Sequence, residues 1–295
     1  MMRKLILVSF ALVLAYIALI QWKLYFHTRS DVEFWKRGAN QATHETAQRV
    51  YSFSFSKYTE NGERELEIEG DSADIFSQNV ALINVIAKAY AEETPVTITA
   101  DKGSIDRTSN EILLNRNVVA STENGARLMT DQLTIHPNDK RMETDSATKV
   151  KKDNINIEGM GAISDSELNK VKFKKTVTVV VQDPDSETKS PTVITSDGPL
   201  EIDYKRDVAH FSNNVVAHHD RGVLTADYMD VLYDKDSRRV WKIIARGNVV
   251  IESKEGNTTY SDNAVYLAKE GRVVLGGDVE AEYRKNESGF DESFF

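Results

Sequence analysis

Hydrophobic and polar residues alternate along most of the chain after residue 49. Residues 50–58 read VYSFSFSKY, so that aromatic side chains share one face and serines share the other. A period of two is typical of a β-strand with one buried face. An Asn-Gly pair follows at 61–62, and residues 64–69 alternate again. Because Asn-Gly favours a tight reversal between strands, the pattern predicts a β-hairpin here.

The same strand–turn–strand pattern recurs about every 30 residues. An aspartate closes the first strand of each predicted unit: Asp71, Asp101, Asp131, Asp197, Asp227 and Asp262. The long gap before Asp197 holds one degenerate unit at residues 155–159, with Gly159 in the place of the aspartate. Repetition at a fixed spacing indicates stacked units that share a core. We expect these aspartates to cap turns through their own backbone rather than to bind metal, because one carboxylate per unit does not assemble a ligand shell.

The polar segment 182–191, QDPDSETKSP, interrupts the pattern. Its two prolines do not suit a central strand. It is either a linker between two domains or a long hairpin loop between strands at 177–181 and 192–195. Each half has about 100–130 residues, which is enough for a core of its own. We therefore divide the chain after residue 49 into a β-module at 50–181 and a second at 192–285, followed by a tail at 286–295.

The N-terminal stretch from Leu5 to Ile20 is apolar apart from one serine, and it follows two basic residues. A helix continued to Trp22 would be about 27 Å long, against a hydrocarbon core of about 30 Å. Bulky residues follow it, whereas signal peptidase requires small ones, so we favour an uncleaved anchor over a cleaved signal peptide. The basic residues predict a cytoplasmic N-terminus within residues 1–27, with a polar linker at 28–49 and the bulk of the chain outside the cytoplasm.

The composition of the chain argues against several kinds of functional site. The chain has no cysteine, 37 Lys+Arg and 46 Asp+Glu, for a net charge of −9. This argues against disulfide and thiolate sites and against general nucleic-acid binding. His218 and His219 are adjacent in a predicted strand and point to opposite sides, so they cannot chelate one ion. No nucleotide-binding or hydrolase motif is present. We predict no catalytic residue, metal or cofactor; a polysaccharide-cleaving β-solenoid is the enzymatic alternative.

Residues 5 to about 175 resemble the LptC family, a single-pass component of the lipopolysaccharide export machine. The resemblance rests on the apolar N-terminal stretch, the hairpin at 53–68 with its YTENG turn, the segment ITADKG at 98–103 and LMTD at 128–131. The usual members of that family end near the equivalent of residue 190. The present chain continues well beyond this point, so a second module follows.

Residues 192 to about 284 resemble the LptA/OstA module. The segments that carry this resemblance are ITSD at 194–197, FSNNV at 211–215, LTAD at 224–227, RGNV at 246–249 and LGGDV at 275–279. The two resemblances imply an all-β fold: two stacked, antiparallel, twisted and slightly open β-jellyrolls, preceded by one transmembrane helix through Leu5, Ile20 and Trp22.

The resemblances also imply a function. The protein would be an inner-membrane, single-pass periplasmic component of the lipopolysaccharide bridge. It would accept lipid from the inner-membrane Lpt ABC transporter and pass it toward the outer membrane along a hydrophobic groove, with LptA-like or outer-membrane bridge proteins as further partners. The alternative is a membrane-tethered envelope scaffold of β-repeats that carries no lipid.

The groove would bind the acyl chains of lipid A. Without Arg3 and Lys4 the exported part carries a charge of −11, which repels phosphates, so affinity must come from apolar burial, about 0.8 kcal/mol per methylene. An ordinary sandwich core demands the same alternation, and the sequence leaves both interpretations open. The groove candidates are Tyr51, Phe53, Phe55, Leu66, Ile68, Ile98, Leu114, Leu128, Ile135, Ile157, Phe173 and Phe211.

An incomplete jellyroll leaves unpaired strand edges, to which another chain can add a strand. The strand at 50–58 would face the membrane transporter. At the far end, Val273, Leu275 and Tyr283 would contact the next bridge protein by head-to-tail strand addition. A continuous groove through both modules is the resulting hypothesis.

Overall fold

The computed structural model describes residues 48–90, 95–182, 190–234, 236–237 and 239–283. Over these residues the chain forms seventeen β-strands and one short 3-10 helix, η1 (Pro137–Asp139), which confirms the predicted all-β class. The strands are β1 (Gln48–Tyr58), β2 (Arg64–Ile75), β3 (Asn79–Ala89), β4 (Val96–Asp106), β5 (Ile112–Thr122), β6 (Arg127–His136), β7 (Arg141–Lys152), β8 (Ile155–Asp165), β9 (Lys170–Val181), β10 (Thr192–Ser196), β11 (Leu200–Asp203), β12 (Val208–His219), β13 (Gly222–Asp234), β14 (Arg239–Ser253), β15 (Thr258–Leu267), β16 (Arg272–Gly276) and β17 (Glu280–Glu282).

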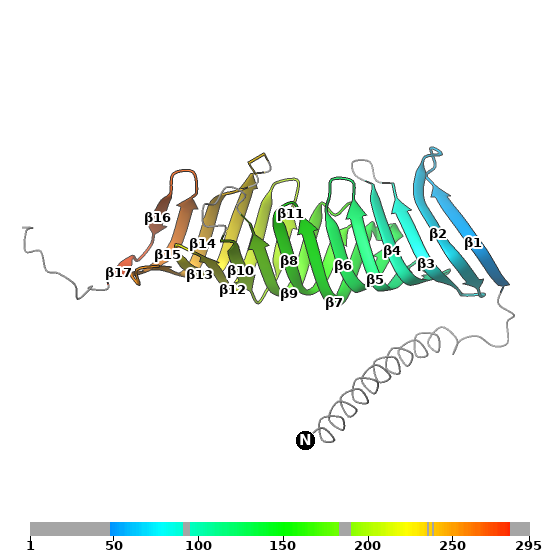
Figure 1. The fold of residues 1–295 in the computed structure, drawn as a ribbon, viewed down its shortest axis with the longest axis horizontal. Helices are drawn as coiled ribbons and strands as arrows, with labels where there is room; N and C mark the ends of the chain where they lie inside the picture. The colour runs from blue at the N-terminus through cyan, green and yellow to red at the C-terminus, as the bar shows by residue number, and fades with distance from the viewer. Residues whose placement is uncertain (1–47, 91–94, 183–189, 235, 238, 284–295) are drawn as a thin grey trace, which may run out of the picture.

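All strands belong to one antiparallel sheet, in which strands close in the chain are neighbours (Figure 1). β10 and β11 both pair with β9 on one side and with β12 on the other, so they are two halves of one strand position. β16 and β17 likewise both pair with β15. The sheet therefore runs as an up-and-down meander from β1 at one edge to β16 and β17 at the other, and its long axis crosses the strands.

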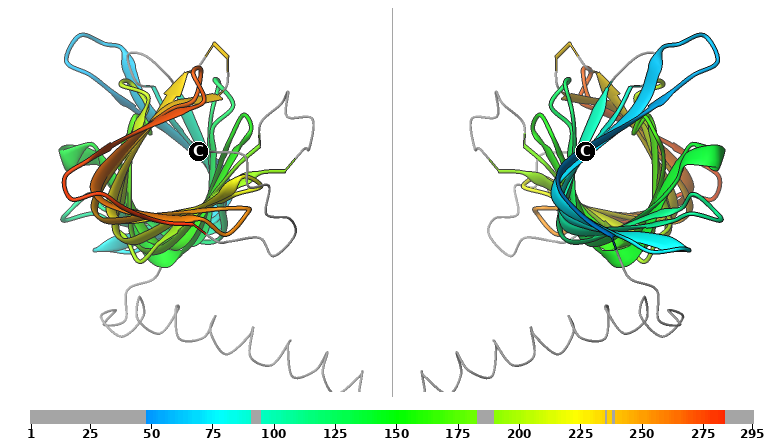
Figure 2. Two further views of the ribbon diagram at one scale, coloured as in Figure 1. Left: turned by 90° about the vertical axis from the view of Figure 1, so that its left-hand side faces the viewer. Right: turned by 90° about the vertical axis from the view of Figure 1, so that its right-hand side faces the viewer.

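Many strands bend near their middle, and these bends fold the sheet along its length. Asn84, Asn117, Asn214 and Asn248 have positive φ angles, between 46° and 53°. In β5, Leu114 before the bend and Val118 after it are both 0% exposed, so both halves of this strand face the interior. The view along the long axis shows the result, a sheet curled around a central axis (Figure 2).

The repeated aspartates stabilise these bends. In four pairs of adjacent strands, the side-chain amide of an asparagine on one strand donates to the carboxylate of an aspartate on the other. The pairs are Asn84 to Asp71 at 2.6 Å, Asn117 to Asp101 at 2.7 Å, Asn214 to Asp197 at 2.6 Å and Asn248 to Asp227 at 2.8 Å. Our expectation that the aspartates end strands and cap turns is wrong, because most of them lie inside strands. The bonds join adjacent strands at the bend, where side chains must replace missing backbone pairing.

Gly159 breaks the aspartate pattern for a steric reason. A Cβ atom at this position would lie 2.8 Å from Cδ1 of Phe173. Phe173, on β9, is fully buried, and its ring occupies the space that a side chain on β8 would need. In the degenerate unit, a glycine therefore takes the place of the aspartate and a buried aromatic ring packs over it.

The buried side chains form one long core and one small one. The long core extends from Ile68 on β2 to Val231 on β13. The small one contains Ala226, Ala245, Val249 and Ala264. Leu224 packs against both, so apolar side chains line the interior from the N-terminal strands almost to the C-terminal edge.

The strands on either side of the segment 182–191 pair directly, with Thr192 opposite Val181. The sheet is thus continuous across the boundary between the two predicted modules. No helix in the described ranges is long and apolar enough to cross a membrane. The predicted anchor through Leu5, Ile20 and Trp22 lies outside them.

Candidate functional site: the apolar interior and its seam

Most groove candidates point into the interior. Phe53, Leu66 and Ile135 are partly buried and pack against the long core. Of the other candidates, those that are buried within this core are Ile68, Ile98, Leu114, Leu128, Ile157, Phe173 and Phe211. The twelve positions therefore share one interior, apart from two on β1.

Tyr51 and Phe55 on β1 are 71% and 56% exposed. The expected single buried face of this strand is therefore wrong for these two residues. The backbone is left-handed at Ser52, with φ of 52°, so β1 bends between Tyr51 and Phe53. β1 also pairs with β2 alone among the described strands, so no second neighbour covers it. Its aromatic side chains form an exposed edge.

Because the sheet is folded along the line of bends, the strand ends form two rims that face each other across a seam. The first rim includes the end of β7, the turn at 153–154 and the junction of β9 with β10. The second rim includes the turns between β11 and β12 and between β13 and β14.

A cavity of about 70 Å³ lies inside the seam where the two modules join. It is lined from both rims: Ile155 and Val181 come from the first, Val208 and Val240 from the second, and Phe211 lies deeper on β12. Its walls are almost wholly apolar, and the polar side chains among them are Lys152, Asp203, Tyr204, Asp207 and Tyr233. An apolar cavity of this kind is suited to hydrocarbon.

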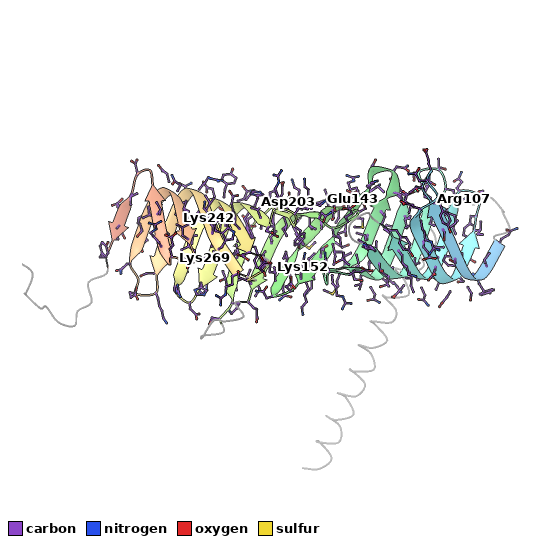
Figure 3. The ribbon with its side chains drawn as sticks, turned by 90° about the horizontal axis from the view of Figure 1, so that it is seen from above. Arg107, Glu143, Lys152, Asp203, Lys242 and Lys269 are labelled. Carbon is purple, nitrogen blue, oxygen red and sulfur yellow. The ribbon has the colours of Figure 1, made fainter. Side chains whose placement is uncertain are left out.

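Two contacts bridge the rims over this cavity. Lys152 Nζ lies 4.5 Å from the centre of the Tyr204 ring, and the Tyr233 hydroxyl donates to Asn154 Oδ1 at 2.7 Å. In Figure 3, Lys152 and Asp203, the neighbour of Tyr204, lie in the middle of the long axis, between Glu143 and Lys242. A cation–π contact and a neutral hydrogen bond together contribute about 1–3 kcal/mol. We call these four side chains the latch.

Burial raises the pKa of Tyr204 to about 12, so its hydroxyl stays neutral at physiological pH. The ring therefore faces the lysine ammonium as a neutral aromatic face. Sequence reasoning missed the latch, because Asn154 and Tyr233 are 79 residues apart and only the folded sheet brings them together. Asn154 lies in the turn before β8 and Tyr233 near the end of β13, and neither position carries a pattern that predicts the contact.

Charged side chains fix the N-terminal edge. Arg49 on β1 donates to both carboxylate oxygens of Asp74 on β2, at 2.6 and 2.7 Å, and this holds the pKa of Asp74 below its usual range. The Tyr90 hydroxyl donates to Glu67 at 2.8 Å and, with Arg64 and Lys88, lowers the pKa of Glu67. Both carboxylates stay ionised at neutral pH, and they tie β1 and β2 to their neighbours.

The C-terminal edge is open and exposes several apolar side chains beside charged ones. β16 and β17 pair with β15 and with no other described strand. Val273 and Val274 are exposed, and Tyr283 is 82% exposed, whereas Leu275 is partly buried against the small core. Among the three predicted contact residues, Val273 and Tyr283 are thus accessible at this edge, and Leu275 supports it from inside.

The described residues form polar clusters that join neighbouring strands. They contain no group of three or more His, Asp or Glu side chains placed to hold a metal ion. His136 lies between Glu111 and Glu143, at 3.0 and 3.2 Å, and joins neighbouring strands. His210 contacts Asp230 at 2.7 Å on the outer side of β12. The apolar interior is the feature that the fold builds most extensively.

A bent antiparallel sheet with an apolar interior and two open edges defines an elongated, jellyroll-like class of β-protein. The family model described as lipopolysaccharide-assembly, LptC-related, matches residues 10–182. The chain therefore belongs to the LptC family. The model of the LptA/LptD N-terminal lipopolysaccharide transport protein matches residues 193–291. A search of curated proteins found no match.

The two matches confirm an LptC-family chain with a C-terminal LptA-like module. They place the chain in the lipopolysaccharide transport bridge of the cell envelope, among transport proteins. The boundary between the matches, at 182–193, coincides with the pairing of β9 with β10 and with the cavity under the latch.

Proposed function

We propose that the chain is a single-pass inner-membrane protein whose folded sheet carries lipopolysaccharide through the periplasm. Acyl chains enter from the inner-membrane Lpt ABC transporter at the β1 end and leave at the β16–β17 end. The anchor is the apolar stretch from Leu5 to Ile20, with the N-terminus in the cytoplasm. The protein binds and passes lipid and catalyses no reaction.

The observation that carries this proposal is the apolar interior that crosses both family matches. The long core begins on β2, within the LptC match, and includes Phe211 and Met229, within the LptA-like match. A scaffold of two independent modules would need no shared interior. Since the chain is acidic, with a net charge of −9, apolar burial is the available source of affinity for acyl chains.

The two open edges support transfer between proteins. β1 presents Tyr51 and Phe55 at the end that follows the predicted anchor, and β16 presents Val273 at the opposite end. An unpaired edge with exposed apolar side chains accepts a strand from another protein. We therefore assign β1 to the transporter and the β16–β17 edge to a further LptA-like or outer-membrane bridge protein.

Site-specific photo-cross-linking tests the proposal. A photoreactive phenylalanine analogue is placed at Phe53, Ile98 or Phe211 in cells that make labelled lipopolysaccharide. We expect lipid adducts at all three interior positions and none at Tyr260, an exposed residue on β15 that serves as the control. Adducts confined to residues 50–180 would refute carriage by the second module, and their absence from the interior would refute lipid carriage.

Dense packing favours a second candidate, the tethered envelope scaffold. Leu114, Val118 and Phe173 are 0% exposed, and the junction cavity is small, about 70 Å³. A scaffold needs a filled core, whereas a carrier must make room for acyl chains. The cross-linking experiment separates the two, because a scaffold gives no interior lipid adduct while its edge contacts with other proteins persist.

A further inference from the structure

The junction of the two modules combines three features: an apolar cavity, a seam above it, and side chains that bridge the seam. Ile157, Val179 and Ile194 bring the LptC-like and LptA-like parts together at the cavity wall. Lys152 and Asn154 reach from the first rim to Tyr204 and Tyr233 on the second. Lys152, Tyr204 and Tyr233 also line the cavity, so the latch forms part of its roof.

We propose that this junction is a latched acyl-chain site, which opens when the rims separate and through which a chain must pass to reach the second module. The inference rests on the proposed function and adds a location and a control point to it. The occupant is the hydrocarbon chain of lipopolysaccharide, and its polar part stays outside the seam.

The size of the cavity supports an opening site rather than a permanently formed one. At about 70 Å³ it has about half the volume of a dry cavity that takes up benzene, which is about 150 Å³. The closed form thus accommodates only a short piece of an acyl chain. Entry of a longer piece requires the rims to move apart, and the latch holds them together.

The composition of the roof supports hydrocarbon as the occupant. Asp203 and Asp207 border the cavity beside Lys152, and their negative charges disfavour a phosphate at this place. The walls below consist of aliphatic residues and Phe211, which offer burial and no further polar anchor. The cation–π contact and the hydrogen bond of the latch are each weak, and burial of an acyl chain, at about 0.8 kcal/mol per methylene, can outweigh them.

Closing the latch covalently tests the proposal. The natural chain has no cysteine, so Asn154→Cys with Tyr233→Cys introduces a unique pair that a short bis-maleimide can join across the seam. The full chain, in membranes that carry labelled lipopolysaccharide, bears the photoreactive residue at Phe53, Phe211 or Ile251. We expect the closed latch to leave the Phe53 adduct intact and to abolish the adducts at Phe211 and Ile251.

The matched control is Lys149→Cys with Glu158→Cys, a pair on the outer face of β7 and β8 that does not span the seam. Its cross-link should leave all three adducts unchanged.

A second variant weakens the latch instead of closing it. Tyr233→Phe removes the hydrogen bond and keeps the ring, so it should increase the Phe211 adduct. Tyr228→Phe, which removes an exposed hydroxyl on the same strand, is the control and should not change it.

The outcomes separate the latch from the function on which it rests. Equal adducts at Phe211 and Ile251 with the latch closed or free would overturn the latched site and leave lipid carriage intact. Loss of the adducts in the Lys149/Glu158 control as well would also overturn it, since any cross-link would then suffice. No adduct at Phe53 in the unmodified chain would overturn the proposed function and the latch together.

Discussion

At the scale of single residues, the bends depend on asparagine. Asn117 combines a positive φ angle of 50° with an amide that donates to Asp101 at 2.7 Å. A hydrogen bond to a charged group and a left-handed backbone each favour this residue over alanine. We expect Asn117→Ala to lower the free energy of unfolding by about 1–3 kcal/mol in urea denaturation.

Asn117→Gly is the matched control for that substitution. Glycine tolerates the left-handed backbone but lacks the amide, so its loss of stability should be smaller than that of alanine. Equal stability of both variants and the natural protein would show that the Asp–Asn pairs do not stabilise the bends.

Close packing at Gly159 gives a second prediction at this scale. Adding a methyl group brings it against the ring of Phe173, so Gly159→Ala should destabilise the protein by about 1–3 kcal/mol. Thermal unfolding measures the effect. Combining it with Phe173→Leu, which removes the obstructing ring, should cost less than the sum of the two single changes. Additive losses would contradict the steric explanation.

The sequence predicted the aspartates but not their role. Their spacing of about 30 residues follows from the repeat, so it was visible. Their asparagine partners lie 13 to 21 residues further along the chain, on the next strand. A bond of this kind depends on strand register, which alternation alone does not specify. For the same reason, alternation identified the interior residues but did not distinguish the exposed edge strand β1.

At the scale of elements, the two edges should decide which proteins bind. Val273→Lys with Val274→Lys places two charges on the exposed edge strand β16, which disfavours addition of a further strand. We expect this variant to lose cross-links to LptA-like bridge proteins. Circular dichroism should show unchanged strand content.

Met160→Lys is a suitable control, because Met160 is an exposed apolar residue on β8, a strand that is not at an edge of the sheet. It should retain the cross-links. Loss of partner contact in this control, or retention in the β16 variant, would contradict docking at the C-terminal edge.

The elements themselves were largely visible in the sequence, with two informative exceptions. The strand β3 was not predicted, because its sequence NVALINVIAKA is too uniformly apolar to show alternation. The strand position shared by β10 and β11 is broken between Ser196 and Leu200, and the sequence pattern predicted only β10. The segment 182–191 left two interpretations open, and the pairing of Thr192 with Val181 shows that its flanking strands are neighbours.

At the scale of the whole molecule, the continuous sheet should couple the stability of the two modules. Trp241 lies in the LptA-like part, and it becomes the single tryptophan of the chain when Trp22 and Trp35 are changed to phenylalanine. In that background, Phe173→Ala in the LptC-like part should cost about 3–5 kcal/mol. We expect the denaturation midpoint reported by Trp241 fluorescence to fall with it, because Phe173 packs opposite Leu200 of β11.

Independent modules would give a different result. The Trp241 midpoint would then stay at its original value while circular dichroism detected a separate, earlier transition. The substitution Val249→Ala in the small core provides the reciprocal comparison, since it should lower the same midpoint directly.

In the proposed function, lipid travels through one interior shared by both modules. The most direct measurement is a time course of lipid adducts at Ile98 and at Met229 after ATP is supplied to the transporter in membranes that contain the full chain. We expect adducts at Ile98 first and at Met229 later. Lipid adducts on outer-face residues in place of these interior residues would contradict this expectation. Adducts at Ile98 with none at Met229 at any later time would contradict it as well.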